Sequence, residues 1–252
     1  MEFNGKVIII TGAGQGIGRA YALEFAKAGA SVVVADLNVE QAHKVVDEIH
    51  LSTGQKALAI KVDVSDRASA QQMADLTLET FGRIDALINN AAIFSTLKMK
   101  PFEEVQPEEW DLVMAVNARG VFFCCQAVAP AMKKQRYGKI VNISSSVAVT
   151  GRANYAHYVA SKGAVVSLTR ALATELGEFE INVNTISPHG IVTEVPRDTI
   201  RPEQWDAILA SQAIKRKGDV SDMVGTTMFL VSDAAKYITG QTLNVDAGLR
   251  YN

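Results

Sequence analysis

Residues that form disulfides or bind metals are scarce in this sequence. Its 252 residues include two cysteines and four histidines. The cysteines, Cys124 and Cys125, are adjacent, and adjacent side chains on a helix point in different directions, so we expect no disulfide between them. No histidine is spaced from another His, Cys or carboxylate as in a known ligand motif; the four are His43, His50, His157 and His189. The sequence therefore predicts neither an oxidising compartment nor a catalytic metal.

A strong net charge and a long apolar leader are also missing. The formal net charge is −2, so no overall field favours nucleic acid or an anionic membrane. The short basic run Lys133, Lys134, Arg136 falls late in an expected helix, where cations are favourable. The first apolar run, Val7–Ile10, is too short for a signal-peptide core or a membrane span. We therefore expect a cytoplasmic protein without nucleic-acid or membrane partners.

Short runs rich in Val and Ile alternate with longer stretches of helical spacing. Runs without polar alternation are typical of parallel strands covered on both faces. The alternation predicts an α/β protein, a single-domain Rossmann fold with a doubly wound, seven-stranded parallel sheet and helices on both faces. The expected strands are Val7–Ile10, Ser31–Ala35, Ala57–Val62, Ala86–Ile88, Lys139–Ile143, Ile181–Ile186 and Thr242–Val245. The expected helices include Ile17–Ala28, Val39–Leu51, Arg67–Phe81 and Glu108–Gln135.

No linker or repeat divides residues 1–252, but one stretch, 188–219, breaks the pattern. It carries Pro188, Pro196 and Pro202 and a short helical segment near Glu203–Ala213. Long insertions after parallel strands usually cover a binding site, so we expect this one to cover the substrate. Its apolar residues and Phe94 predict a hydrophobic pocket, although Glu194, Arg197 and Asp198 leave polyols open. Those apolar residues are Val192, Val195, Ile200, Trp205, Ile208 and Leu209.

A glycine-rich turn joins the first expected strand to the first expected helix, with the sequence Thr11-Gly12-Ala13-Gly14-Gln15-Gly16-Ile17-Gly18. In this context glycines bring the pyrophosphate of a dinucleotide onto the positive end of the helix. Gly12 allows a tight turn, Gly16 lets the backbone approach the pyrophosphate, and Gly18 permits close packing of helix on strand.

The second expected strand ends at Asp36. A carboxylate at this place can accept hydrogen bonds from the adenosine ribose and repels a 2′-phosphate. No Arg or Lys follows in Leu37-Asn38-Val39, and none lies in the glycine loop before Gly16. The sequence therefore favours NAD over NADP.

The spacing Thr-Gly-x-x-x-Gly-x-Gly resembles that of the short-chain dehydrogenase/reductase family, and further motifs agree over essentially the whole chain. They are Asp63-Val64 after the third strand, Asn89-Asn90-Ala91 after the fourth, Asn117 in the long helix, Ser145 after the fifth strand, and Tyr158 with Lys162. The resemblance implies cofactor contacts from Gly12, Gln15, Gly16, Ile17, Gly18, Asp36, Asp63, Val64, Asn90, Tyr158, Lys162, Ile191 and Thr193. Ile191 and Thr193 match the positions that bind the nicotinamide carboxamide.

The catalytic chemistry can also be argued from residue type. Residues four apart share a helix face, so Tyr158 and Lys162 point together. A nearby ammonium favours the phenolate of tyrosine, whose reference pKa is about 10, and makes Tyr158 a usable base near neutral pH. The resemblance implies that Lys162 also holds the nicotinamide ribose, that Ser145 binds the substrate oxygen, and that Asn117 holds a water linking Lys162 to solvent.

Neighbouring residues compete for two of these roles. Tyr155 has Val159, not a lysine, four residues later, so the pairing selects Tyr158. Ser144, Ser145 and Ser146 are consecutive, and the family's usual separation of serine from tyrosine selects Ser145.

Three positions depart from the family's common pattern. Ala92 and Ala247 stand where glycine or a turn residue is common, and we expect only local changes in backbone freedom. His189 replaces a glycine after the sixth expected strand, close to the nicotinamide and the substrate entrance. Two interpretations stay open. Either His189 occupies a backbone position that tolerates many residues and has no further role, or its side chain contacts the substrate or the diphosphate.

The expected function is hydride transfer between NAD(H) and a secondary alcohol or its ketone, aromatic, alicyclic or otherwise hydrophobic. An alternative is a 3-oxoacyl-[acyl-carrier-protein] reductase whose basic run, Lys133 to Arg136, contacts an acidic carrier. Asp36 argues against it, because reductive biosynthesis usually uses NADPH. A nucleotide-binding regulator without turnover is disfavoured by the complete catalytic set.

The helices expected at Glu108–Gln135 and Tyr155–Leu176 are apolar on several faces, which indicates that more than one face is buried. The family resemblance implies that these helices pair across a twofold axis. We therefore expect a homotetramer, with a dimer as second choice.

Overall fold

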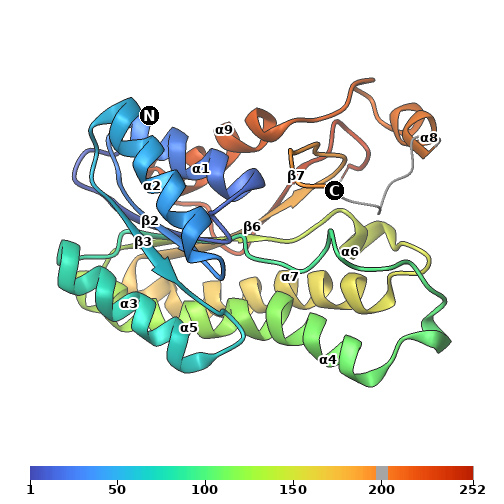
Figure 1. Cartoon of the computed structure of the whole chain (residues 1–252), viewed down its shortest axis with the longest axis horizontal. Helices are drawn as coiled ribbons and strands as arrows, with labels where there is room; N and C mark the ends of the chain where they lie inside the picture. The colour runs from blue at the N-terminus through green and yellow to red at the C-terminus, as the bar shows by residue number, and fades with distance from the viewer. Residues whose placement is uncertain (197–203, 252) are drawn as a thin grey trace.

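All seven strands of the structure, a computed structural model that describes residues 1–196 and 204–251, lie in one parallel sheet (Figure 1). Their spatial order is β3-β2-β1-β4-β5-β6-β7. The crossover direction reverses between β1 and β4, so the order confirms the doubly wound Rossmann topology. The strands are β1 (Val7–Thr11), β2 (Ser31–Asp36), β3 (Ala57–Lys61), β4 (Ala86–Asn89), β5 (Gly138–Ile143), β6 (Ile181–Pro188) and β7 (Thr242–Val245).

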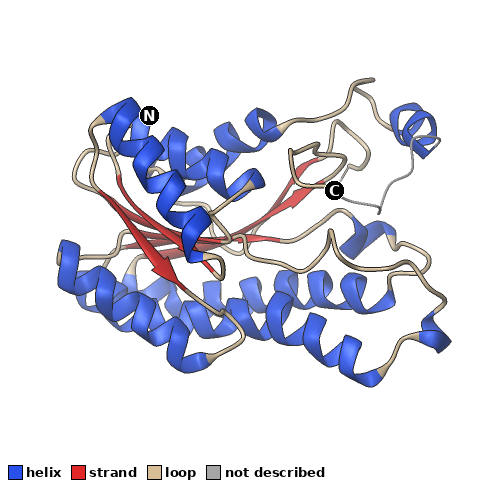
Figure 2. Cartoon of the chain, viewed as in Figure 1, coloured by secondary structure: helices blue, strands red, loops and turns tan. Residues whose placement is uncertain are grey.

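Helices cover both faces of the sheet (Figure 2). On one face lie α1 (Gly16–Lys27), α2 (Val39–Thr53) and α9 (Val220–Val231), and on the other α3 (Arg67–Phe81), α5 (Gly120–Gln135) and α7 (Ala156–Leu176). Successive strand residues point to opposite faces. Ile8 and Ile10 accordingly belong to the core under α1, whereas Val7 and Ile9 belong to the core under α5. Burial on both sides is the reason that these strands are continuously apolar.

Capping residues account for the ends of α2 and α3. The side chain of Asn38 accepts a hydrogen bond from the Gln41 backbone at the start of α2, and Asp66 does the same for Ala68 at the start of α3. Gly54 and Gly82 end the same helices with φ of +70° and +74°, a conformation that glycine adopts without strain.

The long helix expected over Glu108–Gln135 is divided into three parts. It consists of α4 (Pro107–Met114), a π-helical turn (Ala115–Arg119) and α5. Single π turns inside helices are frequent at functional sites, and this one carries Asn117. By length and composition the whole stretch could cross a membrane, yet Cys124, Val128 and Met132 lie buried in the domain core.

Two further helices lie near the carboxyl ends of the strands. The short α6 (Val147–Thr150) follows β5 and lies outside the elements expected from the sequence. In the covering stretch, α8 (Gln204–Ser211) agrees with the helical segment expected near Glu203–Ala213, although Glu203 itself lies outside the described residues. Cys124 and Cys125 are buried free thiols, as expected.

Candidate functional site

A cavity of about 1000 Å³ opens at the carboxyl ends of the strands, around the reversal between β1 and β4. Ligands of open parallel sheets bind in this crevice. The cavity brings together most of the residues predicted from the sequence: Gly12, Gln15, Gly16, Ile17, Asp36, Asp63, Val64, Asn90, Ser145, Tyr158, Lys162, Ile191 and Thr193. Gly18 and Asn117 lie behind its wall instead of in it.

The geometry of the glycine loop accounts for its glycines. Gly12 and Gly16 have φ of +63° and +60°. A Cβ on Gly12 would lie 2.8 Å from the Ala91 Cα, and one on Gly18 would lie 2.2 Å from the Gly12 carbonyl oxygen. Gly18 therefore lets α1 pack closely against the loop that follows β1, and Gly16 is the glycine at which α1 begins.

Asn90, the residue that follows β4, holds this loop in place through hydrogen bonds. Its side-chain amide donates to the carbonyl oxygens of Thr11 and Gly12, each at 3.0 Å. The Thr11 hydroxyl accepts in turn from the backbone N–H of Asn90 and of Ala91, each at 3.1 Å. Thr11 is a site residue that the sequence reasoning missed, although its place as the last residue of β1 is a signal that could have identified it.

A carboxylate from the covering stretch already occupies the start of α1. The backbone N–H of Gly16 donates to Glu194 Oε1 at 2.8 Å. The amino end of a helix attracts anions because its first N–H groups lack partners within the helix. Glu194 thus places a negative charge at the amino end of α1, where the diphosphate of a dinucleotide is expected.

Asp36 and Asp63 line the end of the cavity formed by β2 and β3. Asp36 accepts from the backbone N–H groups of Gly14 (2.8 Å) and Asn38 (2.9 Å). Because Asn38 caps α2, Asp36 is not needed for that role. Each carboxylate oxygen has two lone pairs, so Asp36 can still accept from ribose hydroxyls. Asp63 Oδ1 accepts from the backbone N–H and the hydroxyl of Ser65.

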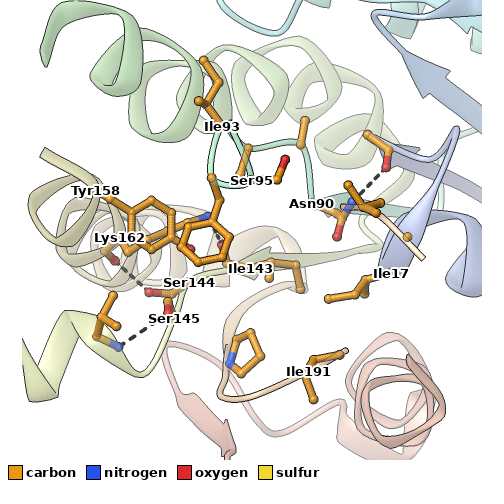
Figure 3. A pocket seen from close by; sticks show the side chains of 18 of the residues that line it. Ile17, Asn90, Ile93, Ser95, Ile143, Ser144, Ser145, Tyr158, Lys162 and Ile191 are labelled. Carbon is orange, nitrogen blue, oxygen red and sulfur yellow. Dashed lines mark hydrogen bonds between the residues drawn. The ribbon is translucent and has the colours of Figure 1, made fainter. Parts of the chain in front are cut away.

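Tyr158 and Lys162 share one face of α7 and line the same part of the cavity (Figure 3). The Lys162 ammonium donates to the Ile143 carbonyl oxygen at 2.8 Å and lies 5.8 Å from the centre of the Tyr158 ring. Burial lowers the pKa of Lys162 to about 8. Phe94 packs on Tyr158 with its ring centre 4.7 Å away, which limits the positions the phenol can take.

The three consecutive serines after β5 differ in their contacts. The Ser144 hydroxyl donates to the Lys162 carbonyl oxygen at 2.8 Å, and the Ser146 hydroxyl lies 2.8 Å from His189 Nδ1. Within the part of the chain that the structure describes, the Ser145 hydroxyl has one long contact, 3.5 Å, in which it accepts from the Val147 backbone. Ser145 is therefore the serine whose hydroxyl is least committed within the protein, consistent with the choice made from its spacing.

Asn117 links the π turn to two other elements. Its carbonyl oxygen accepts from the Ile93 backbone at 2.7 Å, and its amide donates to the Ile93 carbonyl (3.1 Å) and to the Ser161 hydroxyl (3.2 Å). These contacts hold the loop after β4 against α7. Asn117 is fully buried, so the water relay expected of it stays a prediction.

The departures from the family pattern have different consequences. Ala92 has no positive φ, whereas Ala247 adopts φ of +57°, which costs free energy for a residue with a Cβ. The His189 side chain lines the cavity, with Nε2 buried and without a hydrogen-bond partner among the described residues. Burial lowers the pKa of His189; the charge of Asp246 opposes this shift and that of Arg152 adds to it.

Only some of the apolar residues expected to form the substrate pocket line the cavity. Val195, Ile208 and Phe94 line it, but Val192, Trp205 and Leu209 do not. Trp205 instead packs under the Lys217 ammonium, which lies 4.6 Å from its ring centre. The expectations for Arg197, Asp198, Ile200 and Pro202 fall outside the described residues. Sequence reasoning missed other apolar side chains on the wall, namely Ile93, Leu112, Val116 and Val147.

Tyr155 is separated from the cavity although it is close to Tyr158. It is fully buried and does not line the cavity, and its ring centre lies 6.4 Å from that of Tyr158. Within residues 1–196 and 204–251, no three His, Cys, Asp or Glu side chains gather as a metal-binding group.

Comparison with known proteins identifies relatives over nearly the whole chain. A family model described as enoyl-(acyl carrier protein) reductase matches residues 12–250. The 3-oxoacyl-[acyl-carrier-protein] reductase FabG of Staphylococcus aureus is 38% identical over 245 residues, which is 97% of this chain and 98% of that protein. An uncharacterized oxidoreductase of Mycobacterium tuberculosis is 43% identical over 246 residues, 98% of either chain.

Solved structures agree in fold as well as in sequence. A 7α-hydroxysteroid dehydrogenase complexed with NADH and 7-oxoglycochenodeoxycholic acid superposes with a TM-score of 0.93 at 38% identity, covering 98% of this chain and 95% of its own. Levodione reductase superposes with a TM-score of 0.88 at 31% identity, covering 98% of both chains.

Proposed function

Because the chain belongs to the short-chain dehydrogenase/reductase family, we propose that it transfers a hydride between NAD(H) and a secondary alcohol or its ketone. Membership makes it an oxidoreductase with a nicotinamide cofactor. The observation that carries the proposal is that Tyr158, Lys162 and Ser145 line the same cavity as the glycine loop and Asp36. An acid–base group and a dinucleotide site in one crevice are what hydride transfer from an alcohol requires.

The residues of the cavity have separate roles in this proposal. The nicotinamide, when bound, accepts a hydride from the alcohol carbon or donates one to the ketone. Tyr158 takes the hydroxyl proton during oxidation and returns it during reduction, while Ser145 donates a hydrogen bond to the reacting oxygen. The Lys162 ammonium favours the phenolate form of Tyr158 by its charge.

The cofactor contacts divide between the two ends of the cavity. The loop from Gly12 to Gly16, with Gln15 and Ile17, would hold the diphosphate at the start of α1. Asp36 would accept from the adenosine ribose, with Asp63, Val64 and Asn90 beside the adenine half; Ile191 and Thr193 would contact the carboxamide. Support for NAD comes from the charge of Asp36 and from the absence of Arg and Lys at residues 37–39. The 7α-hydroxysteroid dehydrogenase neighbour is described with NADH.

A hydrophobic ketone is favoured by the apolar residues of the wall, which include Phe94, Leu112, Val116, Val147 and Ile208. Two neighbours point the same way by their names, a steroid dehydrogenase with an oxo acid and levodione reductase. A steroid is alicyclic, which is one of the kinds of hydrophobic substrate expected from the sequence, beside aromatic and other apolar ones.

A 3-oxoacyl-[acyl-carrier-protein] reductase is the second candidate, favoured by the relative of that name. The basic run does not support it. Lys133 and Lys134 end α5 just before β5 begins at Gly138, so they lie at the amino edge of the sheet, away from the cavity at the carboxyl edge. Turnover of an acetoacetyl-pantetheine thioester, and none of alicyclic ketones, would favour this candidate.

We also propose that the protein is cytoplasmic and a homotetramer. Exposed apolar side chains on the interrupted helix support assembly: Trp110 and Phe122 are each 40% exposed. Apolar side chains on an outer helix face favour contact with another protein surface.

The proposed reaction is tested by replacing Tyr158 with phenylalanine, which removes the acid–base group and little volume. We expect activity on a panel of secondary alcohols to fall by about 10²–10⁴-fold. NADH binding, followed by fluorescence, should persist because the glycine loop and Asp36 remain.

Tyr155→Phe is the matched control, because Tyr155 lies on the same helix start but outside the cavity. It should keep most of the activity. Activity of Tyr158→Phe within a few-fold of the parent would contradict the role of this residue.

A further inference from the structure

The loop after β4 forms part of the cavity wall beside Tyr158. Ile93 and Ser95 line the same pocket as Tyr158 (Figure 3). Phe94, which lies between them in the chain, packs on the Tyr158 ring with ring centres 4.7 Å apart. Farther along the loop, Leu97 packs with Tyr158 in a small apolar cluster. The position of this loop therefore affects both the shape of the pocket and the freedom of the proposed acid–base group.

A cluster of three polar side chains outside the cavity, Lys100, Glu109 and His157, ties the end of this loop to α7. Glu109, in the first turn of α4, accepts from the Lys100 ammonium at 2.6 Å through Oε2. Its other oxygen, Oε1, lies 3.3 Å from Nε2 of His157, the residue before Tyr158. The Lys100 backbone N–H also donates to the Asn154 carbonyl oxygen at 3.2 Å. One carboxylate thus joins the loop, α4 and α7.

Burial gives the contact between His157 and Glu109 more weight than a surface contact has. The His157 side chain is fully buried, and its Nδ1 has no hydrogen-bond partner within the described part of the chain. A carboxylate only accepts hydrogen bonds, so the imidazole proton in this contact is on Nε2. A buried polar ring costs free energy unless it is hydrogen-bonded, and an apolar side chain would fill the same space without that cost. The hydrogen bond to Glu109 is therefore what a histidine supplies at this position.

The charges of the cluster are paired, but water reaches part of them. The hydrogen bond from Lys100 lowers the pKa of Glu109; burial opposes this shift and the hydrogen bond from His157 adds to it. The Lys100 and Glu109 side chains are 25% and 23% exposed, and ion pairs that water reaches contribute little to global stability. Catalysis is more sensitive, because a displacement of about 1 Å in an active site can cost about 10²-fold in rate. The cluster thus matters more for the place of the loop than for stability.

We propose that His157 is a positioning residue: through Glu109 and Lys100 it holds the loop after β4, so that Phe94 keeps Tyr158 in place for proton transfer. The inference rests on the proposed function for the role of Tyr158. The position of the loop, however, can be followed without turnover.

Two replacements of His157 separate its hydrogen bond from its burial. Glutamine carries an amide nitrogen at the reach of histidine Nε2 and can still donate to Glu109, whereas the shorter asparagine carries one at the reach of Nδ1. The readout is kcat with the best substrate of the alcohol panel, expressed per NADH-binding site so that unfolded protein does not count. His157→Asn should lower kcat by about 10-fold because Tyr158 is displaced, and His157→Gln should stay within about twofold of the parent. The Kd for NADH should change in neither.

Replacing the shared acceptor tests the same interaction from its other side. Glu109→Ala should lower kcat by about the same factor as His157→Asn, and the losses should not add in the double variant, because both changes remove one interaction. Glu108→Ala is the matched control and should keep the activity. It removes the same charge from the same turn of α4, at an exposed position.

Amide hydrogen exchange reports on the loop in the absence of turnover. Residues 92–101 should exchange faster in His157→Asn and Glu109→Ala than in the parent, His157→Gln and Glu108→Ala, because the loop opens more often. Residues 12–18, in the glycine loop, should exchange equally in all of these proteins.

The outcomes separate this inference from the proposed function. Equal loss of kcat in His157→Gln and His157→Asn, additive losses in the double variant, or unchanged kcat in His157→Asn would overturn the inference while leaving the reaction in place. Unchanged exchange of residues 92–101 in His157→Asn would overturn it as well. Faster exchange confined to this loop, in a protein that turns over no alcohol, would support the role of His157 and count against the proposed reaction.

Discussion

Burial of the Lys162 ammonium predicts a pH-dependent stability that can be isolated with one variant. Lys162 is 3% exposed, and burial lowers its pKa from 10.5 to about 8. At 1.36 kcal/mol for each pH unit, this shift corresponds to about 3 kcal/mol of free energy that opposes folding while both states are protonated. Lys162→Met removes the titrating group and keeps an unbranched chain.

The direction follows from proton binding in the two states. Below pH 8 the lysine is protonated in the folded and the unfolded protein, so the cost of burying the charge is fully present. Between pH 8 and 10.5 the folded protein loses this proton while the unfolded chain keeps it, so stability rises with pH. The free energy of unfolding of the parent, minus that of Lys162→Met, should therefore increase by about 2–3 kcal/mol between pH 7 and pH 10.

Urea denaturation at a fixed protein concentration measures this difference at each pH. Taking the difference cancels the titration of other groups, and also the constant loss of the hydrogen bond to Ile143. Lys44→Met, which also replaces a lysine by methionine but at an exposed position of α2, is the matched control. A flat difference for Lys162→Met would refute the reasoning, since Lys162 would then not be buried as a charge.

Three further predictions concern the cofactor and the assembly. The parent should prefer NAD over NADP by at least about 10-fold in kcat/KM, and Asp36→Ala should reduce this preference because it removes the repulsion of the 2′-phosphate. Equal use of both cofactors by the parent would contradict the role assigned to Asp36. Glu194→Gln should bind NADH about fivefold more tightly, because a neutral amide competes less well than a carboxylate for the Gly16 N–H; weaker binding in a fluorescence titration would show that Glu194 assists the cofactor. Sedimentation at micromolar concentration should give a tetramer, and a monomer would exclude the proposed assembly.

Much of the site could be predicted because its residues follow directly after strands. In a parallel sheet the carboxyl ends of the strands meet at one edge, so the sequence alone predicts that Asp36, Asn90 and Ser145 lie near the glycine loop. Tyr158 and Lys162 share a helix face because of the helical period alone. Each of these expectations depends only on a short segment, and the parallel sheet brings the segments together around one cavity.

Contacts between distant segments could not be predicted in the same way. The contact between Glu194 and Gly16 spans the chain from the covering stretch to the first helix, and no local pattern specifies it. The same holds for the π turn at Asn117, where the contacts with Ile93 and Ser161 accompany a departure from the regular helix. Trp205, Leu209 and Val192 were expected in the pocket because they are apolar, but apolar character does not determine which surface a side chain packs against.

The sequence by itself determined the fold class, the order of the elements and the residue types at the strand ends, because hydrophobic period and glycine placement are properties of short segments. Tertiary structure decided which hydroxyl of Ser144, Ser145 and Ser146 stays least committed, and that Glu109 contacts both Lys100 and His157. Hydrogen-bond partners and electric fields depend on distances between atoms far apart in the chain, and only packing sets those distances.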